Sequence, residues 1–317
     1  MTPGATGTGM HVVAHGGAGS PADEPADRQA VLDEAVACGA EQTDPVAAVC
    51  AAVRVLEVDP QFNAGVGGAV QSDGVPRTDA GLMTDNGAVG AAGAMPGVAH
   101  AVDVARAVME RTPHVLLAGE RAVDFADAVG VETGVDLWSD STRERWGDDE
   151  PPEVGTEPHL QWVRENFAGD ESEADGDPGD GTDESDDDGT LDARDHDTVG
   201  AVATDGETVA AATSTGGRWR ALAGRVGDVP QVGGGFYASE AGGASATGAG
   251  EAIAREGLAR RAVTLLDQGA APDRAADIAI AEFDNAADGD AGLIVMGGDG
   301  EAGEAYNSPA MQTSRSP

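Results

Sequence analysis

Apolar residues recur along the first sixty positions with spacings that predict one strand and two helices. A short apolar run at 10–14 ends in a glycine-rich stretch at 15–19, which predicts an inner strand followed by a tight glycine loop. A helix is predicted over 25–39. A second helix begins at Asp44, a capping residue, with Pro45 in the first helical position. Its apolar residues follow at helical spacing: Val46, Val49, Val53 and Leu56.

The glycine-rich middle of the first half predicts strands with close backbone approaches. Glycines recur from 62 to 93, with Val, Met and Ala between them, which is typical of short strands rather than of a flexible linker. Two helices are predicted after this stretch, at 97–110 and 118–129.

The second half predicts hairpins around a helical stretch. A strand at 198–203 and its partner at 208–213 flank an Asp205-Gly206 turn, helices are predicted at 250–267 and 272–284, and a closing hairpin at 293–306. Strands at both ends of the chain, with helices grouped between them, predict an α+β fold. The expected layer order is helix, sheet, sheet, helix.

A strongly acidic segment separates the two halves. Residues 169–197 contain almost no apolar side chains, so they cannot contribute to a core, and a disordered tether is predicted. The segment does not match the ligand spacing of a calcium loop. We therefore divide the chain into residues 1–168, the acidic linker 169–197, and residues 198–317.

The charge balance is extreme, with 57 acidic residues against 18 basic ones, a net charge of −39. Lysine is absent from the sequence, and the chain stays strongly acidic even without the linker. Such charge destabilises a compact state at low salt, whereas at ~1 M salt the Debye length is only ~3 Å. We interpret the chain as a cytoplasmic protein of a salt-accumulating halophile; the alternative is an ordinary acidic protein with one acidic loop.

Composition also excludes several kinds of partner. The chain has no basic patch to neutralise phosphates, so nucleic acid is not an expected partner. It has no apolar run approaching 18 residues and no signal-peptide pattern, so no membrane association is expected. These patterns predict a soluble, intracellular protein.

Candidate chemistry lies where the acidic linker meets the predicted strand, at Asp197 and Thr198. A threonine hydroxyl is a weak nucleophile unless a base removes its proton. Cleavage before Thr198 would place an α-amino group, with a reference pKa of about 7.7–8.0, beside that hydroxyl. Taken alone, the threonine could equally be an ordinary strand residue.

Seven segments give the junction its context. They are VAHGGAG at 13–19, LE at 56–57 with PQFNAG at 60–65, TDAGLM at 78–83, DTVGAV at 197–202, ATSTGG at 212–217, GRVGD at 224–228 and ATGAGE at 246–251. Together, and in this order, they resemble the plant-type asparaginase and isoaspartyl aminopeptidase family of N-terminal-nucleophile hydrolases. The resemblance spans nearly the whole chain except the linker.

The resemblance implies a four-layer αββα sandwich and self-cleavage between Asp197 and Thr198. Thr198 would be the nucleophile in both cleavage and catalysis, and Thr215 would hydrogen-bond to it. Arg225 would bind the α-carboxylate of the substrate and Asp228 its α-ammonium group. This assignment suits the chemistry, because a guanidinium forms a planar two-point pair with a carboxylate. The alternative is a structural Arg–Asp ion pair.

The remaining implied site residues surround the nucleophile. The Thr247 hydroxyl and the Gly248 amide would form the oxyanion hole, Gly250 would line the amine pocket, and Asn63 would lie near the nucleophile. By itself, the stretch around Gly248 could be a simple helix entry. His15 is expected to support the glycine loop rather than to take part in catalysis.

The family's sodium-binding loop corresponds to the stretch from Leu56 to Val66. No cofactor is required, but a structural sodium is implied through backbone carbonyls of Leu56, Glu57, Asp59, Phe62, Ala64 and Val66. A loop that only packs is the alternative. The resemblance also implies an assembly of two αβ pairs, a homodimer of heterodimers.

The implied substrates are small molecules: L-asparagine and β-aspartyl peptides, hydrolysed to release L-aspartate. Two departures from the family pattern bear on specificity. The His196-Asp197-Thr198 junction looks like the glycosylasparaginase branch, and Arg218-Trp219-Arg220 is bulky beside the expected leaving group. The alternatives are a glycosylasparaginase-like hydrolase of N-substituted asparagine and an acidic binding protein that never matures.

Overall fold

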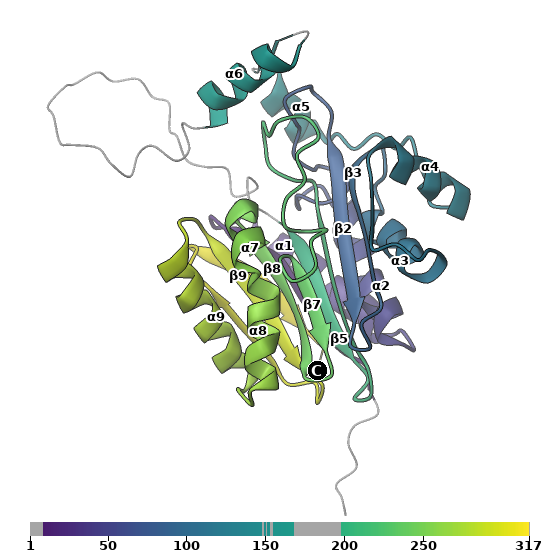
Figure 1. Cartoon of the computed structure of the whole chain (residues 1–317), viewed down its shortest axis with the longest axis vertical. Coiled ribbons are helices and arrows are strands. Elements are labelled where there is room, and N and C mark those ends of the chain that lie inside the picture. The colour runs from purple at the N-terminus through teal and green to yellow at the C-terminus, as the bar shows by residue number, and fades with distance from the viewer. Residues whose placement is uncertain (1–8, 148, 150, 153–154, 168–197, 317) are drawn as a thin grey trace, which may run out of the picture.

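Two β-sheets form the centre of the protein, and the larger of them is built from both halves of the chain (Figure 1). The computed structural model describes residues 9–147, 149, 151–152, 155–167 and 198–316. Asp197 and the predicted tether at 169–197 lie outside the described residues. Within the described residues, mostly antiparallel strands combine with helices, so the predicted α+β class is confirmed.

The larger sheet has seven strands, and its order brings the segments on either side of the linker together. The strands run in the order β11-β1-β5-β6-β2-β3-β4, and β3–β4 is the parallel pair. Strands β5 and β6, from the second half, lie between β1 and β2 from the first half. The bounds are β1 His11–Gly19, β2 Arg77–Thr84, β3 Val89–Pro96, β4 Leu116–Ala118, β5 Val199–Thr204, β6 Val209–Thr215 and β11 Ala310–Arg315.

The smaller sheet has four antiparallel strands, all from the second half, in the order β10-β9-β8-β7. The bounds are β7 Phe236–Ser239, β8 Gly242–Gly248, β9 Ala291–Gly297 and β10 Ala302–Tyr306. The face of β8 that carries Ser245 and Thr247 contacts strands of the larger sheet.

Helices cover the face of each sheet that points away from the other sheet. Helices α1, α2 and α3 pack against the larger sheet, and α8 and α9 against the smaller one. Helices α5 and α6 lie together at one end of the molecule (Figure 1). The bounds are α1 Pro25–Ala40, α2 Pro45–Val58, α3 Ala101–Arg111, α4 Glu120–Val129, α5 Asp140–Trp146, α6 Thr156–Phe167, α7 Gly250–Glu256, α8 Leu258–Asp267 and α9 Pro272–Ala286.

Alternation along the strands divides the apolar side chains into three layers. On β5, Val199, Ala201 and Ala203 face the helices of the larger sheet, whereas Val202 faces the smaller sheet. Successive strand residues point to opposite faces, so one strand contributes to two layers. A third layer lies between the smaller sheet and α8 and α9.

Several predicted elements are confirmed. Helix α2 begins at Pro45, and the side chain of Asp44 accepts a hydrogen bond from the Ala47 amide at 2.9 Å. The predicted strands at 198–203 and 208–213 correspond to β5 and β6. Helices α1, α3, α4 and α9 also lie near their predicted positions.

Other expectations were wrong or incomplete. The predicted glycine loop at 15–19 belongs to β1, which pairs with β5 and β11 around a bulge. The predicted helix at 250–267 is broken at Gly257, whose φ of 65° is left-handed. The 62–76 part of the glycine-rich stretch forms turns. The predicted hairpin at 293–306 is present as β9 and β10, but it does not close the chain, because a further strand, β11, follows it.

No helix in the described part of the chain is both long enough and apolar enough to cross a bilayer.

Candidate active site

Strand register places two threonine hydroxyls on the same face of the larger sheet. Thr198 immediately precedes β5, and in the β5–β6 pairing Val199 lies opposite Ser214, so Thr198 comes opposite Thr215. On β6, Ala211 and Thr213 face the smaller sheet, and Thr215 continues this alternation. Both hydroxyls therefore lie at the edge of the space between the two sheets.

Thr198 is buried, and its Oγ1 donates a hydrogen bond to Thr215 Oγ1 at 3.2 Å. The Thr215 hydroxyl also accepts from the Gly217 amide at 3.1 Å and donates to the Asn63 carbonyl at 3.4 Å. These contacts hold Thr215 in one orientation toward Thr198.

Asn63 connects the loop before β2 to the residues that follow β6. Its side-chain amide donates to the Gly217 carbonyl at 2.7 Å, and its Oδ1 accepts from the Ala69 amide at 2.7 Å. Its backbone carbonyl also accepts from the Gly216 amide at 2.8 Å. The structure thus places Asn63 behind Thr215, where it supports the end of β6.

A small cavity opens beside the two threonines. It is lined by Thr198, Thr215, Gly217, Arg218, Arg225, Asp228, Gly248 and Gly250. Six of the residues expected from the sequence are in this lining. Of the other expected residues, Asn63 and Thr247 lie behind the lining formed by the described residues.

Arg225 is held by a carboxylate that the sequence analysis did not single out. Its Nε and Nη2 donate to the two carboxylate oxygens of Glu251, each at 2.8 Å. Burial raises the pKa of Glu251, but the hydrogen bonds and charge of Arg225 outweigh that effect and leave the pKa below its usual value. The two-point pair orients the guanidinium at the cavity.

Asp228 is a buried carboxyl group beside this guanidinium. Burial raises its pKa to about 7, although the charge of Arg225 works in the opposite direction. Among the described residues, its Oδ2 is buried and has no hydrogen-bond partner. A buried carboxylate oxygen without a partner is costly, so a cationic donor from a ligand would be stabilised there.

Two glycines in the lining of the cavity could not carry a side chain, for different reasons. A Cβ at Gly250 would lie 2.6 Å from Asp228 Oδ1 and 2.8 Å from Arg225 Nη2. Gly248 has a φ of 128°, and a Cβ there would lie 2.2 Å from the Asp290 carbonyl oxygen. Glycine therefore leaves space at position 250 and permits the backbone conformation at position 248.

Thr247 precedes Gly248 on β8 and faces the larger sheet. It is fully buried, and its hydroxyl accepts a hydrogen bond from the Ala18 amide at 3.3 Å. This contact fixes the end of β8 against β1, and it places the Thr247 hydroxyl next to the Gly248 backbone.

His15 lies between the sheets rather than in the cavity. It was expected to support a glycine loop, but that segment belongs to β1, and His15 instead contacts a strand of the smaller sheet. Its Nε2 and the Ser245 hydroxyl are 2.7 Å apart, and Ser245 is in turn 2.7 Å from the Thr213 hydroxyl. Burial lowers the pKa of His15 to about 3, and a hydrogen bond with the Thr198 backbone opposes that shift. A neutral His15 therefore joins three strands beneath Thr198.

Asp79 is a second buried acid that the sequence analysis did not single out. It lies on β2 opposite Thr215, and its Oδ1 accepts from the Ala94 amide at 2.6 Å. Burial raises its pKa to about 6, while hydrogen bonds from the amides of Ala94 and Gly227 and the charge of Arg225 oppose the shift. Asp79 thereby ties β2 to the loop that carries Arg225.

The loop expected to bind sodium packs directly behind β6. The Glu57 carbonyl accepts from the Val66 amide at 2.9 Å, and the Asp59 carbonyl from the Phe62 amide at 3.1 Å. A carbonyl oxygen has a second lone pair, so both can still serve as cation ligands. The Glu57 side chain is buried and accepts from Ser214 Oγ at 2.6 Å, away from the carbonyl set.

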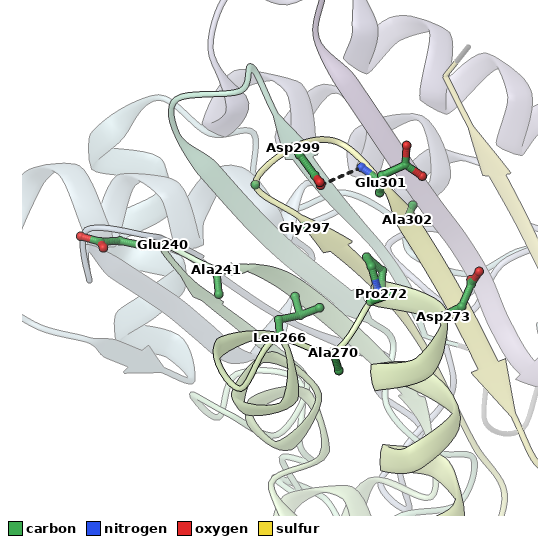
Figure 2. A pocket seen from close by; sticks show the side chains of 13 residues that line it. Glu240, Ala241, Leu266, Ala270, Pro272, Asp273, Gly297, Asp299, Glu301 and Ala302 are labelled. Atoms are coloured by element: carbon green, nitrogen blue, oxygen red, sulfur yellow. Dashed lines mark hydrogen bonds between the residues drawn. The ribbon is translucent and has the colours of Figure 1, made fainter. Parts of the chain in front are cut away.

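A larger hollow lies at the opposite end of β8 (Figure 2). Its acidic side chains come from Glu240, Asp273, Asp299 and Glu301, and Asp299 accepts a hydrogen bond from the Glu301 amide at 3.2 Å. Its described lining contains no hydroxyl, thiol or basic side chain. This described lining therefore lacks the threonine hydroxyls and the arginine side chains that line the smaller cavity.

The residues that sequence reasoning missed lie inside motifs it had already found. Glu251 ends the segment at 246–251, and Asp79 belongs to the segment at 78–83. Their spacing along the chain gave no sign that Glu251 pairs with Arg225 or that Asp79 reaches Gly227. Only the contact between distant loops shows these roles.

The chain is similar to known proteins over almost its full length. The model of a family described as "Asparaginase" matches residues 8–316. A plant-type L-asparaginase of Pyrobaculum calidifontis is 38% identical, with 95% of this chain and 94% of the relative covered. A plant-type L-asparaginase of Pyrococcus abyssi is 35% identical over the same shares. An isoaspartyl peptidase/L-asparaginase of Macaca fascicularis is 34% identical, covering 95% and 91%.

The matches extend over almost the full length of the chain and place it among hydrolytic enzymes. The chain belongs to the asparaginase family.

Proposed function

We propose that this protein is a self-processing amidohydrolase that cleaves the β-amide of L-asparagine and of β-aspartyl dipeptides and releases L-aspartate. One observation carries the proposal. The hydrogen-bonded hydroxyls of Thr198 and Thr215 share a cavity with Arg225 and Asp228. The family membership and the names of the relatives agree with it.

Cleavage of the Asp197–Thr198 bond creates the general base. The freed α-amine lies beside its own hydroxyl, and its reference pKa of about 7.7–8.0 suits proton transfer near neutrality. The amine takes the proton of Thr198 Oγ1 as that oxygen attacks the β-carbonyl carbon, and the Thr215 hydroxyl keeps the nucleophile oriented. The amine then protonates the departing nitrogen, and a β-aspartyl ester remains on Thr198.

The oxyanion formed in this attack faces the Gly248 amide and the Thr247 hydroxyl. Gly248 lines the cavity, and Thr247 is fixed next to it by Ala18. Preorganised donors of this kind contribute most in the transition state, and loss of one typically costs about 10²–10³-fold in rate. Water then attacks the ester by the same route and releases aspartate.

The aspartyl end of the substrate carries one carboxylate and one ammonium group. The Arg225 guanidinium complements the carboxylate, and the unpaired, buried Oδ2 of Asp228 complements the ammonium. The open space at Gly250 leaves room for the substrate atoms between these two charges.

The proposal extends to the chain's organisation. Residues 1–168 and 198–317 form the two subunits of one αββα domain, and the protein assembles as a homodimer of αβ pairs. The loop from Leu56 to Val66 binds a structural sodium through carbonyls. Support for the layered fold comes from the two apposed sheets and from the helices on their outer faces.

The proposed function is tested by intact-mass analysis combined with substrate assays. The purified chain of 31.6 kDa should be cleaved into two fragments, and the smaller fragment should begin at Thr198. It should hydrolyse asparagine and a β-aspartyl dipeptide in preference to a glycosylated asparagine. Turnover of the glycosylated compound alone would favour the glycosylasparaginase alternative. An uncut, inactive chain would favour the acidic binding protein.

We also propose that the protein is adapted to high salt inside the cell, because its net charge is −39. We expect its thermal midpoint to rise by at least ~10 °C between 0.1 M and 3 M KCl, which corresponds to roughly 3–5 kcal/mol for a domain of this size. The measurement is circular dichroism during heating, with 1 M sucrose at 0.1 M KCl as the uncharged control. An equal midpoint at both salt concentrations would contradict salt adaptation.

A further inference from the structure

Arg218 lines the catalytic cavity, but the mechanism above gives it no role. It follows Gly217 directly, and it shares the cavity with Thr198, Arg225 and Asp228. Its side chain is half-buried, and its charge helps to lower the pKa of Glu251, so it acts electrostatically within the site.

The residues after Arg218 anchor its backbone to the other half of the chain. Trp219 is buried and contacts Trp146 of α5 edge-to-face, with ring centroids 6.1 Å apart. Trp146 also contacts Trp138 and Trp162 in the same manner, so all four tryptophans of the protein form one cluster. Such edge-to-face contacts stabilise the packing of aromatic rings beyond the burial of their surfaces.

An ion pair formed by the next residue, Arg220, also anchors this segment. Arg220, whose φ is 58°, places Nη2 2.8 Å from Asp149 Oδ1. The Asp149 side chain is 4% exposed, so this pair is shielded from solvent. Arg218 thus projects from a segment held at both Trp219 and Arg220, which makes it a preorganised cation rather than a mobile surface residue.

Charges in the proposed substrates indicate what this cation recognises. Asparagine has one carboxylate and one ammonium group, which Arg225 and Asp228 already match. A β-aspartyl dipeptide has a second carboxylate, on the leaving amino acid, two bonds from the scissile nitrogen. The lining of the cavity correspondingly includes a second arginine, Arg218, in addition to Arg225.

We propose that Arg218 binds the carboxylate of the leaving amino acid and so makes β-aspartyl dipeptides the preferred substrate class. This inference rests on the proposed function and specifies the substrate of the same site. A guanidinium binds a carboxylate through two parallel hydrogen bonds, and such charge-assisted bonds are about twice as strong as neutral ones.

The test compares β-aspartyl-leucine with β-aspartyl-leucinamide, which differ only in the carboxylate that Arg218 would bind. The wild-type enzyme should favour the free acid by about tenfold or more in kcat/KM. Arg218→Gln should reduce this ratio to near one, and Arg218→Lys should restore part of it because the positive charge returns. Arg121→Gln, on the exposed surface of α4, is the matched control and should retain the wild-type ratio.

The outcomes separate this inference from the proposed function. A wild-type ratio near one, or an unchanged ratio in Arg218→Gln, overturns the role of Arg218 even if asparagine is hydrolysed. Failure of the wild-type protein to hydrolyse any of the compounds overturns the proposed function itself. If Arg218→Gln does not fold, the wild-type ratio and the Arg218→Lys ratio still decide the matter.

Discussion

Replacement of Thr198 by alanine is expected to abolish both self-cleavage and hydrolysis. The substitution removes the hydroxyl that lies 3.2 Å from Thr215 Oγ1, so no group remains in place to attack the scissile bond or the substrate. Loss of a nucleophile costs on the order of 10⁶-fold in kcat. Intact-mass analysis should show a single 31.6 kDa chain, and ammonia release from asparagine should fall to background.

Two further variants show whether the hydroxyl itself is responsible. Thr198→Ser keeps a hydroxyl on the same backbone and should still mature and turn over substrate, though more slowly. Thr215→Ala removes the hydrogen-bond partner but not the nucleophile, so it should slow both reactions without eliminating them. Cleavage before residue 198 in the Thr198→Ala protein would refute the proposed nucleophile.

Replacement of Arg225 by glutamine should disable substrate binding while leaving self-cleavage possible. The guanidinium is 16% exposed and is the proposed partner of the substrate α-carboxylate. Loss of one member of such a desolvated pair costs about 2–5 kcal/mol, so we expect kcat/KM for asparagine to fall by roughly 10²-fold or more. Steady-state kinetics on the matured protein, with fragments verified by mass spectrometry, measures this loss.

The chain offers a closely matched control for this substitution. Arg261 forms a similar two-point pair with Glu282, at 2.6 and 2.8 Å, on the exposed surfaces of α8 and α9. Exposed pairs contribute little to stability, about 0–1 kcal/mol. Arg261→Gln should therefore keep kcat/KM close to that of the wild type. Equal losses in the two variants would mean that Arg225 acts on general stability and not on the substrate.

Local pattern was sufficient for the elements whose partners are close in the chain. Asp44 and Pro45 predicted the start of α2, and the Asp205-Gly206 turn predicted the β5–β6 hairpin. The helix predicted at 272–284 corresponds to α9. In each case the deciding contacts lie within a few residues, so the sequence window contained them.

Elements that depend on distant partners were not predictable in this way. Strand β11 forms because Val13 to Gly19 of β1 offers a free edge at the other end of the chain. The residues after His15 become strand for the same reason, since β11 pairs with Ala18 and Gly19, whereas the pairing with β5 ends at His15. Whether this glycine-rich segment forms a loop or a strand therefore depends on whether another strand pairs with it.

The sequence alone determined the family resemblance, the acidic charge and the candidate residues Thr198, Arg225 and Asp228. Tertiary structure alone decided which groups meet. It places Thr198 opposite Thr215 on neighbouring strands, pairs Arg225 with Glu251, and brings Arg218 into the lining of the cavity. The physical reason is that residue type sets what chemistry a side chain can perform. Hydrogen-bond distances of about 3 Å between residues far apart in sequence are set only when strands pair and loops pack in the folded chain.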